Sequence, residues 1–341
     1  MESAIPDHLR CPRSRLRRVP DDYQPPYPSF VARHPTRVTQ VVMAYYGVQS
    51  RAGRAALTPA LAELQARFGA TAGPQHADRA RYIDEAGYAT VIAAAYWDDP
   101  ARYDAWHATH GKAWTGTSRD GLGTFVEVLR PSVERYETLF SAPNRAEGIA
   151  ALASGMSEMV MEHAYWGGAR DRIPASQTDA LAPVGAPRIE QDGAQVVVHG
   201  HEHLCLIRSG QDWADTDAGE RAMYLGDVEP ELRAGMDFLR DDGRAIGCYA
   251  NRYLRVEDDD GRPLEKSYGM SWWKSLAALE RWAESHPTHI AIFGAAMRYL
   301  GKLGPAAQLK LYHEVTVARA DEQRFEYLGC HPATGLLRVG G

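Results

Sequence analysis

Two histidines three residues apart, in the stretch SHPTHIAIFG, have the types and spacing to hold a metal. A residue before proline is pushed out of helical backbone space, so we expect His286 to be extended. Pro287 suits the first turn of a helix, which places His289 inside that turn. The pair is then a poor two-histidine clamp. His289 is the candidate for a single axial ligand, and His286 for a helix cap or a surface group. A packed imidazole, the commoner role of a lone histidine, stays open.

His313 lies in the stretch LKLYHEVTVA, whose apolar and β-branched residues predict a strand. Side chains alternate along a strand, so Leu311, His313 and Val315 share one face. His313 therefore points into the core or into a pocket. An imidazole with an ordinary pKa near 6.5 can exchange protons at neutral pH. A hydrogen-bonded core histidine is the alternative.

The run HGHEH, with histidines at 199, 201 and 203, has the composition of a zinc site. Along an extended chain these side chains are about 7 Å apart on one face, which makes convergence on a tetrahedral ion difficult. We expect a solvated approach to the next strand instead. The chain has no HExxH, Walker, GxSxG or strand-linked GxGxxG motif.

The elements that must position these residues follow one pattern twice. Trp97 and Trp106 are nine residues apart, and so are Trp273 and Trp282. Hydrophobic periodicity predicts strands at 40–50, 87–97, 124–131, 203–209, 245–256, 267–273 and 309–318, and helices at 58–68, 98–110, 220–240 and 276–284. We interpret each half as the ferredoxin-like order β-α-β-β-α-β. Two such halves could pack sheet on sheet or close into a barrel with helices outside.

Composition limits the class of protein. The 341 residues are 45% apolar and 24% charged, as in a soluble globular protein, and the net charge of −6 argues against a nucleic-acid partner. No apolar run reaches the roughly 18 residues of a membrane span, and the N-terminus lacks the apolar core of a secretory signal. Four scattered cysteines indicate free thiols in the cytoplasm. Seven prolines before residue 36 predict an extended arm.

Long blocks of the chain resemble the haem-containing aldoxime dehydratases, in the family's order and almost over the full length. The blocks are MESAIPDHLRCPR at the N-terminus, MEHAYWGGARDRIPASQTD (161–179), LIRSGQDWAD (206–215), GMDFLRDDGRAIGCYANRYLRV (235–256), LERWAESHPTHIAIF (279–293), LKLYHEVTV (309–317) and FEYLGCHPATGLLR (325–338). The chain departs from the family near YLGKLGPAAQ (299–308), where it is a few residues longer.

The resemblance implies roles for five residues: His289 as the proximal ligand of a b-type haem, His313 as the distal acid–base histidine, Ser209 as the partner of the substrate hydroxyl, Arg172 as support of the distal proton network and Glu137 as a carboxylate that assists proton transfer. It implies dehydration of an aldoxime, R–CH=N–OH, to a nitrile and water on ferrous haem. It also implies an α+β fold, a homodimeric α/β barrel made of two ferredoxin-like repeats.

On this interpretation the chain divides into an arm (1–36), a first repeat (37–150), a connecting segment that contributes to the distal haem pocket (151–195) and a second repeat with the haem ligand (196–341). We expect no nucleic-acid or membrane partner. Two alternatives remain: another haem enzyme of this barrel class, such as a peroxidase or a chlorite-dismutase-like enzyme, and a haem-binding protein without catalysis. The latter would need His289 but not Ser209, Arg172 or His313. A zinc hydrolase is a more distant third.

Overall fold

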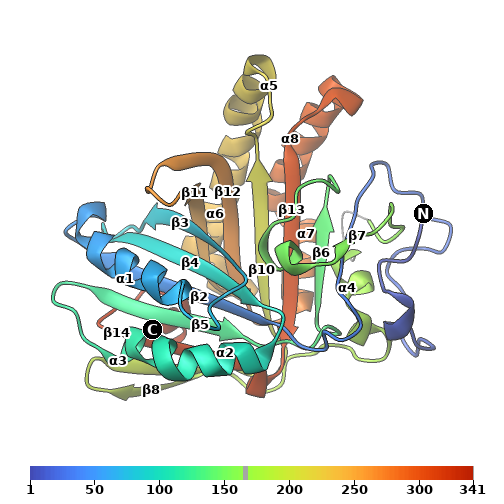
Figure 1. The fold of residues 1–341 in the computed structure, drawn as a ribbon. Helices are drawn as coiled ribbons and strands as arrows, with labels where there is room; N and C mark the ends of the chain where they lie inside the picture. Colours follow the sequence, from blue (N-terminus) through green and yellow to red (C-terminus); the bar gives the residue numbers. More distant parts are fainter. Residues whose placement is uncertain (164–167, 341) are drawn as a thin grey trace.

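A 12-stranded antiparallel sheet forms the centre of the computed structural model, which describes residues 1–163 and 168–340 (Figure 1). Across the sheet the strands are β6 (Tyr136–Phe140), β13 (Lys310–Ala318), β10 (Leu204–Asp212), β12 (Pro263–Trp273), β11 (Cys248–Glu257), β3 (His76–Ile83), β4 (Ala89–Trp97), β2 (Val42–Ser50), β5 (Gly123–Leu129), β14 (Gln323–Leu328), β9 (Gln195–His199) and β8 (Arg188–Asp192). The chain is therefore a mixed α/β protein with a large antiparallel sheet.

Both halves of the chain arrange their four main strands alike. The spatial order is β5-β2-β4-β3 in the first half and β13-β10-β12-β11 in the second. Pairing between β11 and β3 joins the two groups into one sheet. The next strand of each half crosses over, because β6 pairs with β13 and β14 pairs with β5. The sheet curves around a shared core in which Phe125 of β5 lies with Trp272 of β12.

Strand β3 was not predicted from the sequence. Its residues HADRARYI lack an apolar face, because charged side chains alternate with small or aromatic ones. The charges are matched by partners from the other half of the chain. Asp78 is 2.9 Å from Arg208 of β10, and Arg79 donates to the carbonyl of Asp258 at 2.6 Å. A strand stabilised by distant ion pairs gives no local hydrophobic signal.

Helices cover the outer faces of the two halves. In the first half these are α1 (Thr58–Phe68), α2 (Pro100–Trp106) and α3 (Lys112–Gly116), with a π-helical turn (His107–Gly111) joining the last two. The second half carries α5 (Ala218–Met223), α6 (Glu229–Asp241), α7 (Leu276–Ser285) and α8 (Pro287–Leu303). Met236 of α6 and Trp282 of α7 pack with Ile207 of β10 and Val315 of β13. Helices α6 to α8 therefore lie over one face of β10 and β13.

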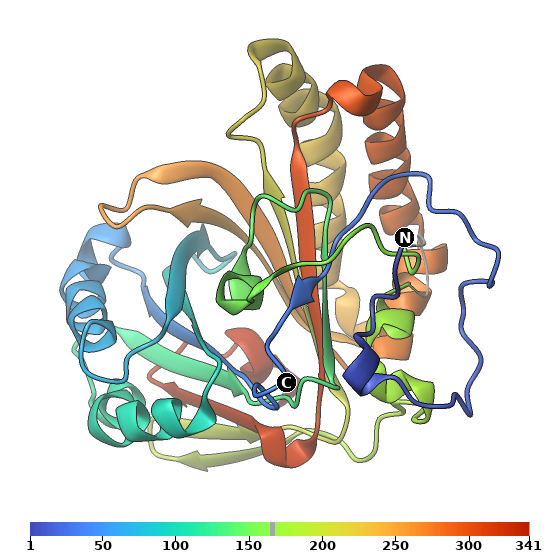
Figure 2. The same cartoon turned by 45° about the vertical axis from the view of Figure 1, so that its right-hand side comes forward.

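The proline-rich arm lies against the body of its own chain (Figure 2). Its only regular elements are a short 3-10 turn (Asp7–Leu9) and β1 (Ala32–Arg33), which pairs with β7 (Gly155–Met156). The carboxylate of Asp171, in α4 (Gly168–Arg172), accepts the backbone N–H groups of Arg18 and Val19 at 2.9 and 2.8 Å. The arm thus fixes α4 from outside. In residues 1–163 and 168–340, no helix has the length and apolar character needed to cross a membrane.

Candidate active site

The start of α8 confirms the predicted difference between the two histidines of SHPTH. His286 is extended, with φ −78° and ψ 133°, and Pro287 is the first helical residue. The Nδ1 atom of His286 accepts the backbone N–H of Thr288, so this imidazole is the N-cap of α8. Its ring also stacks on Phe238 of α6, with centroids 4.3 Å apart. His286 therefore serves the helix, and His289 lies in the first turn.

His289 is held in one orientation and one protonation state. Its Nδ1 donates to the carbonyl of Ala283 at 2.8 Å, and the ring meets Trp282 edge-on with centroids 4.5 Å apart. Burial lowers the pKa of His289 to about 4, against the opposing effect of the bond to Ala283, so the imidazole is neutral at neutral pH. With the proton on Nδ1, the lone pair belongs to Nε2. A carbonyl that orients a histidine in this way is the usual support of a metal-binding imidazole.

The surroundings of His289 fit a haem. Ile290 and Phe293 follow it on α8 with 49% and 37% of their surface exposed. Within the described part of the chain, no three His, Cys, Asp or Glu side chains gather as a metal site. One imidazole beside exposed apolar side chains suits an iron that brings its own macrocyclic ligands.

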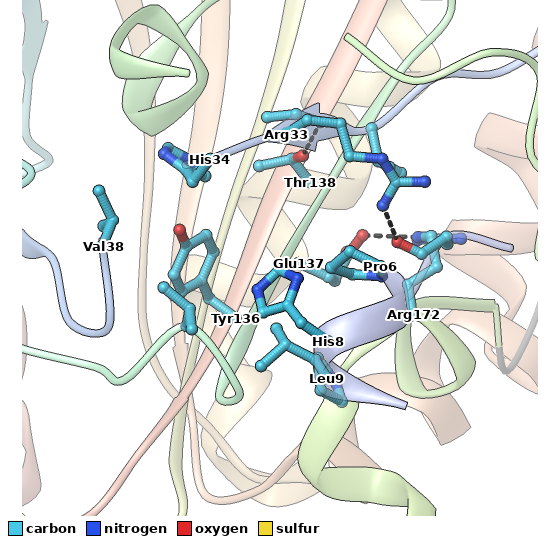
Figure 3. Close-up of a pocket in the computed structure, with 15 residues that line it drawn as sticks. Pro6, His8, Leu9, Arg33, His34, Val38, Tyr136, Glu137, Thr138 and Arg172 are labelled. Carbon is cyan, nitrogen blue, oxygen red and sulfur yellow. Dashed lines mark hydrogen bonds and ion pairs between the residues drawn. The ribbon is translucent and has the colours of Figure 1, made fainter. Parts of the chain in front are cut away.

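Glu137, Arg172 and His313 come together from three separate elements. Arg172, at the end of α4, donates Nε–H to Glu137 Oε2 of β6 at 2.6 Å (Figure 3). Its Nη2 is 2.9 Å from His313 Nε2 of β13, and its Nη1 donates to the carbonyl of Glu162 at 2.6 Å. Glu137 and Arg172 are buried, while 26% of the His313 side chain is exposed. The structure thus brings three of the five predicted site residues into direct contact.

The contacts of His313 Nε2 change with its protonation. Arginine only donates, so the 2.9 Å contact with Arg172 requires a lone pair on Nε2. Glu137 Oε1 lies 3.1 Å from the same nitrogen, within ion-pair distance but without hydrogen-bond geometry in this arrangement. A protonated Nε2 would turn to donate to Glu137. In the described part of the chain Nδ1 of His313 has no hydrogen-bond partner, so it is the nitrogen that a substrate can meet.

Ser209 lies directly across the sheet from His313. The two residues face each other in the register of β10 and β13, and both are half-buried. Ile207 and Val315 are the next opposed pair on this face and pack under the helices. Ser209 and His313 are therefore on the sheet face that α6 to α8 cover, the same side as His289. Arg208, the residue before Ser209 in β10, has its side chain on the opposite face of the sheet, where it is buried.

Helix α4 carries Arg172 and is fixed on two sides. Its Arg170 pairs with both carboxylate oxygens of Glu280 on α7, the shortest contact being 2.7 Å. Its Asp171 holds the arm. A five-residue helix has little stability of its own, so these tertiary contacts determine where Arg172 lies. The preceding residues 164–167, part of the block that resembles the family, lie outside the described residues.

Electrostatics keep Glu137 ionised. Burial by itself raises the pKa of a carboxyl group, but the charge of Arg172, its hydrogen bond and the charge of a protonated His313 outweigh it and lower the pKa of Glu137. The Nδ1 atom of His163 lies 3.2 Å from the carbonyl oxygen of Tyr27 in the arm. Burial, and then the charge of Arg172, lower the pKa of His163 to about 4. His163 is thus neutral and contacts the arm.

The three histidines of the HGHEH run contact different partners, and the predicted solvent exposure is wrong for two of them. His199 is exposed and pairs with Glu190, whereas His201 and His203 are buried. His201 contacts the hydroxyl of Tyr249, and His203 contacts the carbonyl of Ala182 at 2.6 Å. A left-handed φ of 63° at His203 turns the chain here, so the three rings diverge.

Comparison with known proteins identifies the relatives of this chain. Residues 44–336 match the sequence model of the haem-containing dehydratases. The chain is 45% identical to an aliphatic aldoxime dehydratase of Pseudomonas chlororaphis and 46% identical to one of Rhodococcus erythropolis, in both cases over 99% of this chain and 98% of the relative. It is 32% identical to the phenylacetaldoxime dehydratase of Bacillus sp. (strain OxB-1), over 94% of both chains.

Solved structures agree. A crystal structure of an aldoxime dehydratase has a TM-score of 0.92 with this chain at 45% identity, covering 99% of this chain and 98% of that one. An aldoxime dehydratase crystallised with butyraldoxime has a TM-score of 0.93 at 44% identity, covering 99% and 96%.

Proposed function

Since the chain belongs to the family of haem-containing dehydratases, we propose that it is a lyase that converts aldoximes to nitriles and water. The single observation that carries this proposal is the contact of Glu137, Arg172 and His313 on the sheet face that also presents Ser209. The full-length similarity to aldoxime dehydratases supports the substrate class.

We assign the haem to His289, whose Nε2 would ligate the iron. In the ferrous state, bound haem would supply an iron able to bind the oxime nitrogen and to lend electron density to the N–O bond. Every proton transfer falls to the protein. Hydroxide is a poor leaving group, so the oxime oxygen must gain a proton as the N–O bond breaks, and the carbon must lose its hydrogen.

His313 can perform both transfers through Nδ1. The imidazolium gives the Nδ1 proton to the oxime oxygen, which leaves as water. The neutral ring, still protonated at Nε2, then takes the proton from carbon at Nδ1, and the nitrile forms. In both states Nε2–H can donate to Glu137, which fixes the tautomer. Arg172 keeps Glu137 ionised, and Ser209, across from His313, holds the hydroxyl in line for transfer.

The same proposal extends to architecture. The matching strand orders support two ferredoxin-like repeats, at 37–150 and 196–341, that curve into a barrel. Residues 1–36 would form the arm, and 151–195 the connecting segment that supplies Arg172 to the distal pocket. We propose a homodimer in the cytoplasm. The four cysteines, all unpaired, support a reducing compartment.

The test is nitrile formation by the dithionite-reduced holoprotein supplied with butyraldoxime. We expect a haem absorption band that shifts when the aldoxime is added. Ser209→Ala and His313→Ala should keep that band and lose turnover by about 10²- to 10⁴-fold. The proposal would be contradicted if the wild-type protein bound haem but formed no nitrile from any aldoxime. If the wild type, Ser209→Ala and His313→Ala then also had the same absorption spectrum, a haem carrier would be favoured. Peroxide turnover without dehydration would favour the peroxidase.

A further inference from the structure

A small cavity lies behind Glu137, between the arm and strand β6 (Figure 3). Its volume is about 60 Å³, and its lining includes Pro6, His8, His34, Tyr136, Glu137 and Arg172. We call it the arm cavity. The arm contributes one wall, β6 another and α4 a third. Two of the lining residues, Glu137 and Arg172, belong to the proposed proton network.

The walls of the arm cavity carry polar atoms that the described part of the chain does not satisfy. Neither ring nitrogen of His34 has a hydrogen-bond partner there, and neither does the hydroxyl of Tyr136. The two rings meet edge-on with centroids 6.0 Å apart, and the Tyr136 hydroxyl points toward His34 (Figure 3). Burial lowers the pKa of His34 to about 4, so its neutral ring offers one donor and one acceptor. Buried polar groups of this kind are normally hydrogen-bonded.

Water can satisfy these atoms. One water needs roughly 10–15 Å³ of such space and two to four polar partners, so the arm cavity has room for a few. The imidazole of His8, on the outer wall, is exposed to solvent. Because Glu137 lines the same cavity, ordered water could run from the surface at His8, past His34 and Tyr136, to Glu137.

We infer that the arm cavity binds a short chain of ordered water, held by His34 and Tyr136, that solvates Glu137 and exchanges its protons with solvent. His34 and Tyr136 are then positioning residues that act through water on Glu137. This inference rests on the proposed proton-transfer role of Glu137. It assigns a function in that reaction to the arm, which reaches neither Ser209 nor His313 among the described contacts.

Other groups face Glu137 as well and must be kept intact in a test. Arg172 and His313 contact it directly, and His163 lies near both. Arg33 also lines the cavity, but its guanidinium is bound to the carbonyls of Ser3 and Ala4 at 2.7 and 2.6 Å. Substitution of His34 or Tyr136 leaves all of these in place.

The experiment compares His34→Phe and Tyr136→Phe with the wild-type holoenzyme. Removing the water removes solvation of the ionised carboxylate, which raises the pKa of Glu137. We propose that the ionised form of Glu137 is the active one. The low-pH side of the plot of kcat against pH, its acid limb, should therefore move to higher pH by roughly one unit. At a fixed pH on that limb, kcat should be about tenfold lower than in the wild type. The haem spectrum should not change. Tyr46→Phe removes an equally buried hydroxyl under the first-half helices and should leave the limb in place.

A high-resolution crystal structure of the wild-type protein supplies a readout that does not depend on activity. We expect water within hydrogen-bond distance of the Tyr136 hydroxyl and a ring nitrogen of His34. A dry cavity would overturn the inference, and so would an acid limb unchanged in both variants. Loss of thermal stability without a moved limb marks a purely structural role and also overturns it. If the wild-type enzyme forms no nitrile, the proposed function fails, while the crystal structure still tests the water.

Discussion

At the scale of single residues, the two histidines of SHPTH show how backbone context separates identical side chains. Both are imidazoles near the start of α8, but proline fixes His286 outside the helix, where it caps, and His289 inside the first turn. The bond from His289 Nδ1 to Ala283 then determines which nitrogen has a lone pair. The same logic applies to His313, where Arg172 and Glu137 compete for Nε2 according to its protonation.

The first prediction concerns these two histidines. His289→Ala should abolish the haem absorption band, because the only proposed axial ligand is lost. His286→Ala, the same change three residues earlier, should keep haem and lower the free energy of unfolding by about 1 kcal/mol through loss of the cap. Absorption spectra after reconstitution with haem measure haem binding, and urea unfolding measures the free energy of unfolding. Equal haem retention in the two variants would refute the assignment of His289.

At the scale of elements, the proton network depends on the placement of short, weak segments. Helix α4 has five residues, so Arg170 and Asp171 must fix it from the side for Arg172 to reach His313. Glu280, the partner of Arg170, is itself buried on α7, the helix that precedes α8. The ion pair thus joins α4, which carries Arg172, to the helix next to the proposed haem ligand His289.

The second prediction follows from that ion pair. Arg170→Ala should let α4 shift and lower kcat by about 10- to 100-fold, since small misplacements of catalytic groups are costly, while haem binding persists. The control is Arg240→Ala, which removes an arginine whose partners Asp237 and Asp241 are exposed. Steady-state kinetics measure the change in kcat, and absorption spectra show whether haem is still bound. Unchanged kcat in Arg170→Ala would mean that α4 is positioned without it.

Individual elements differ in how well the sequence predicts them. Strands β10 and β13 and the start of α8 were predicted because their apolar patterns and the proline are local signals. The pairing of Ser209 with His313 and the carbonyl under His289 were not, because register and tertiary hydrogen bonds join distant segments. Composition gives no sign of haem. Only the resemblance to the family pointed to Arg172, in a long block, and to Glu137, in the short stretch RYETLF; in a random chain both would be surface charges.

At the scale of the whole molecule, folding buries several histidines in neutral form. Burial lowers the pKa of His34, His107 and His163 to about 4 in the folded state. In the unfolded chain each would titrate near 6.5. Between these values the unfolded state binds more protons than the folded state, so the free energy of unfolding falls as pH decreases from about 6.5 to about 4. These histidines add no further pH dependence below that window.

His107 gives the cleanest test of this third prediction, because it lies in the first half of the chain and has no part in the proposed site. It is buried and stacks on Tyr103, with ring centroids 5.3 Å apart. One such histidine contributes at most about 3 kcal/mol to the acid loss, from 1.36 kcal/mol per pKa unit. His107→Phe should therefore reduce the slope of unfolding free energy against pH between 6.5 and 4. Tyr46→Phe alters the same apolar cluster as Tyr103 without touching His107 or removing a group that titrates in this window, so it should shift stability equally at every pH. Denaturant unfolding of the holoprotein at several pH values distinguishes the two, and parallel curves for His107→Phe and the wild type would show that burial of His107 does not couple folding to protons.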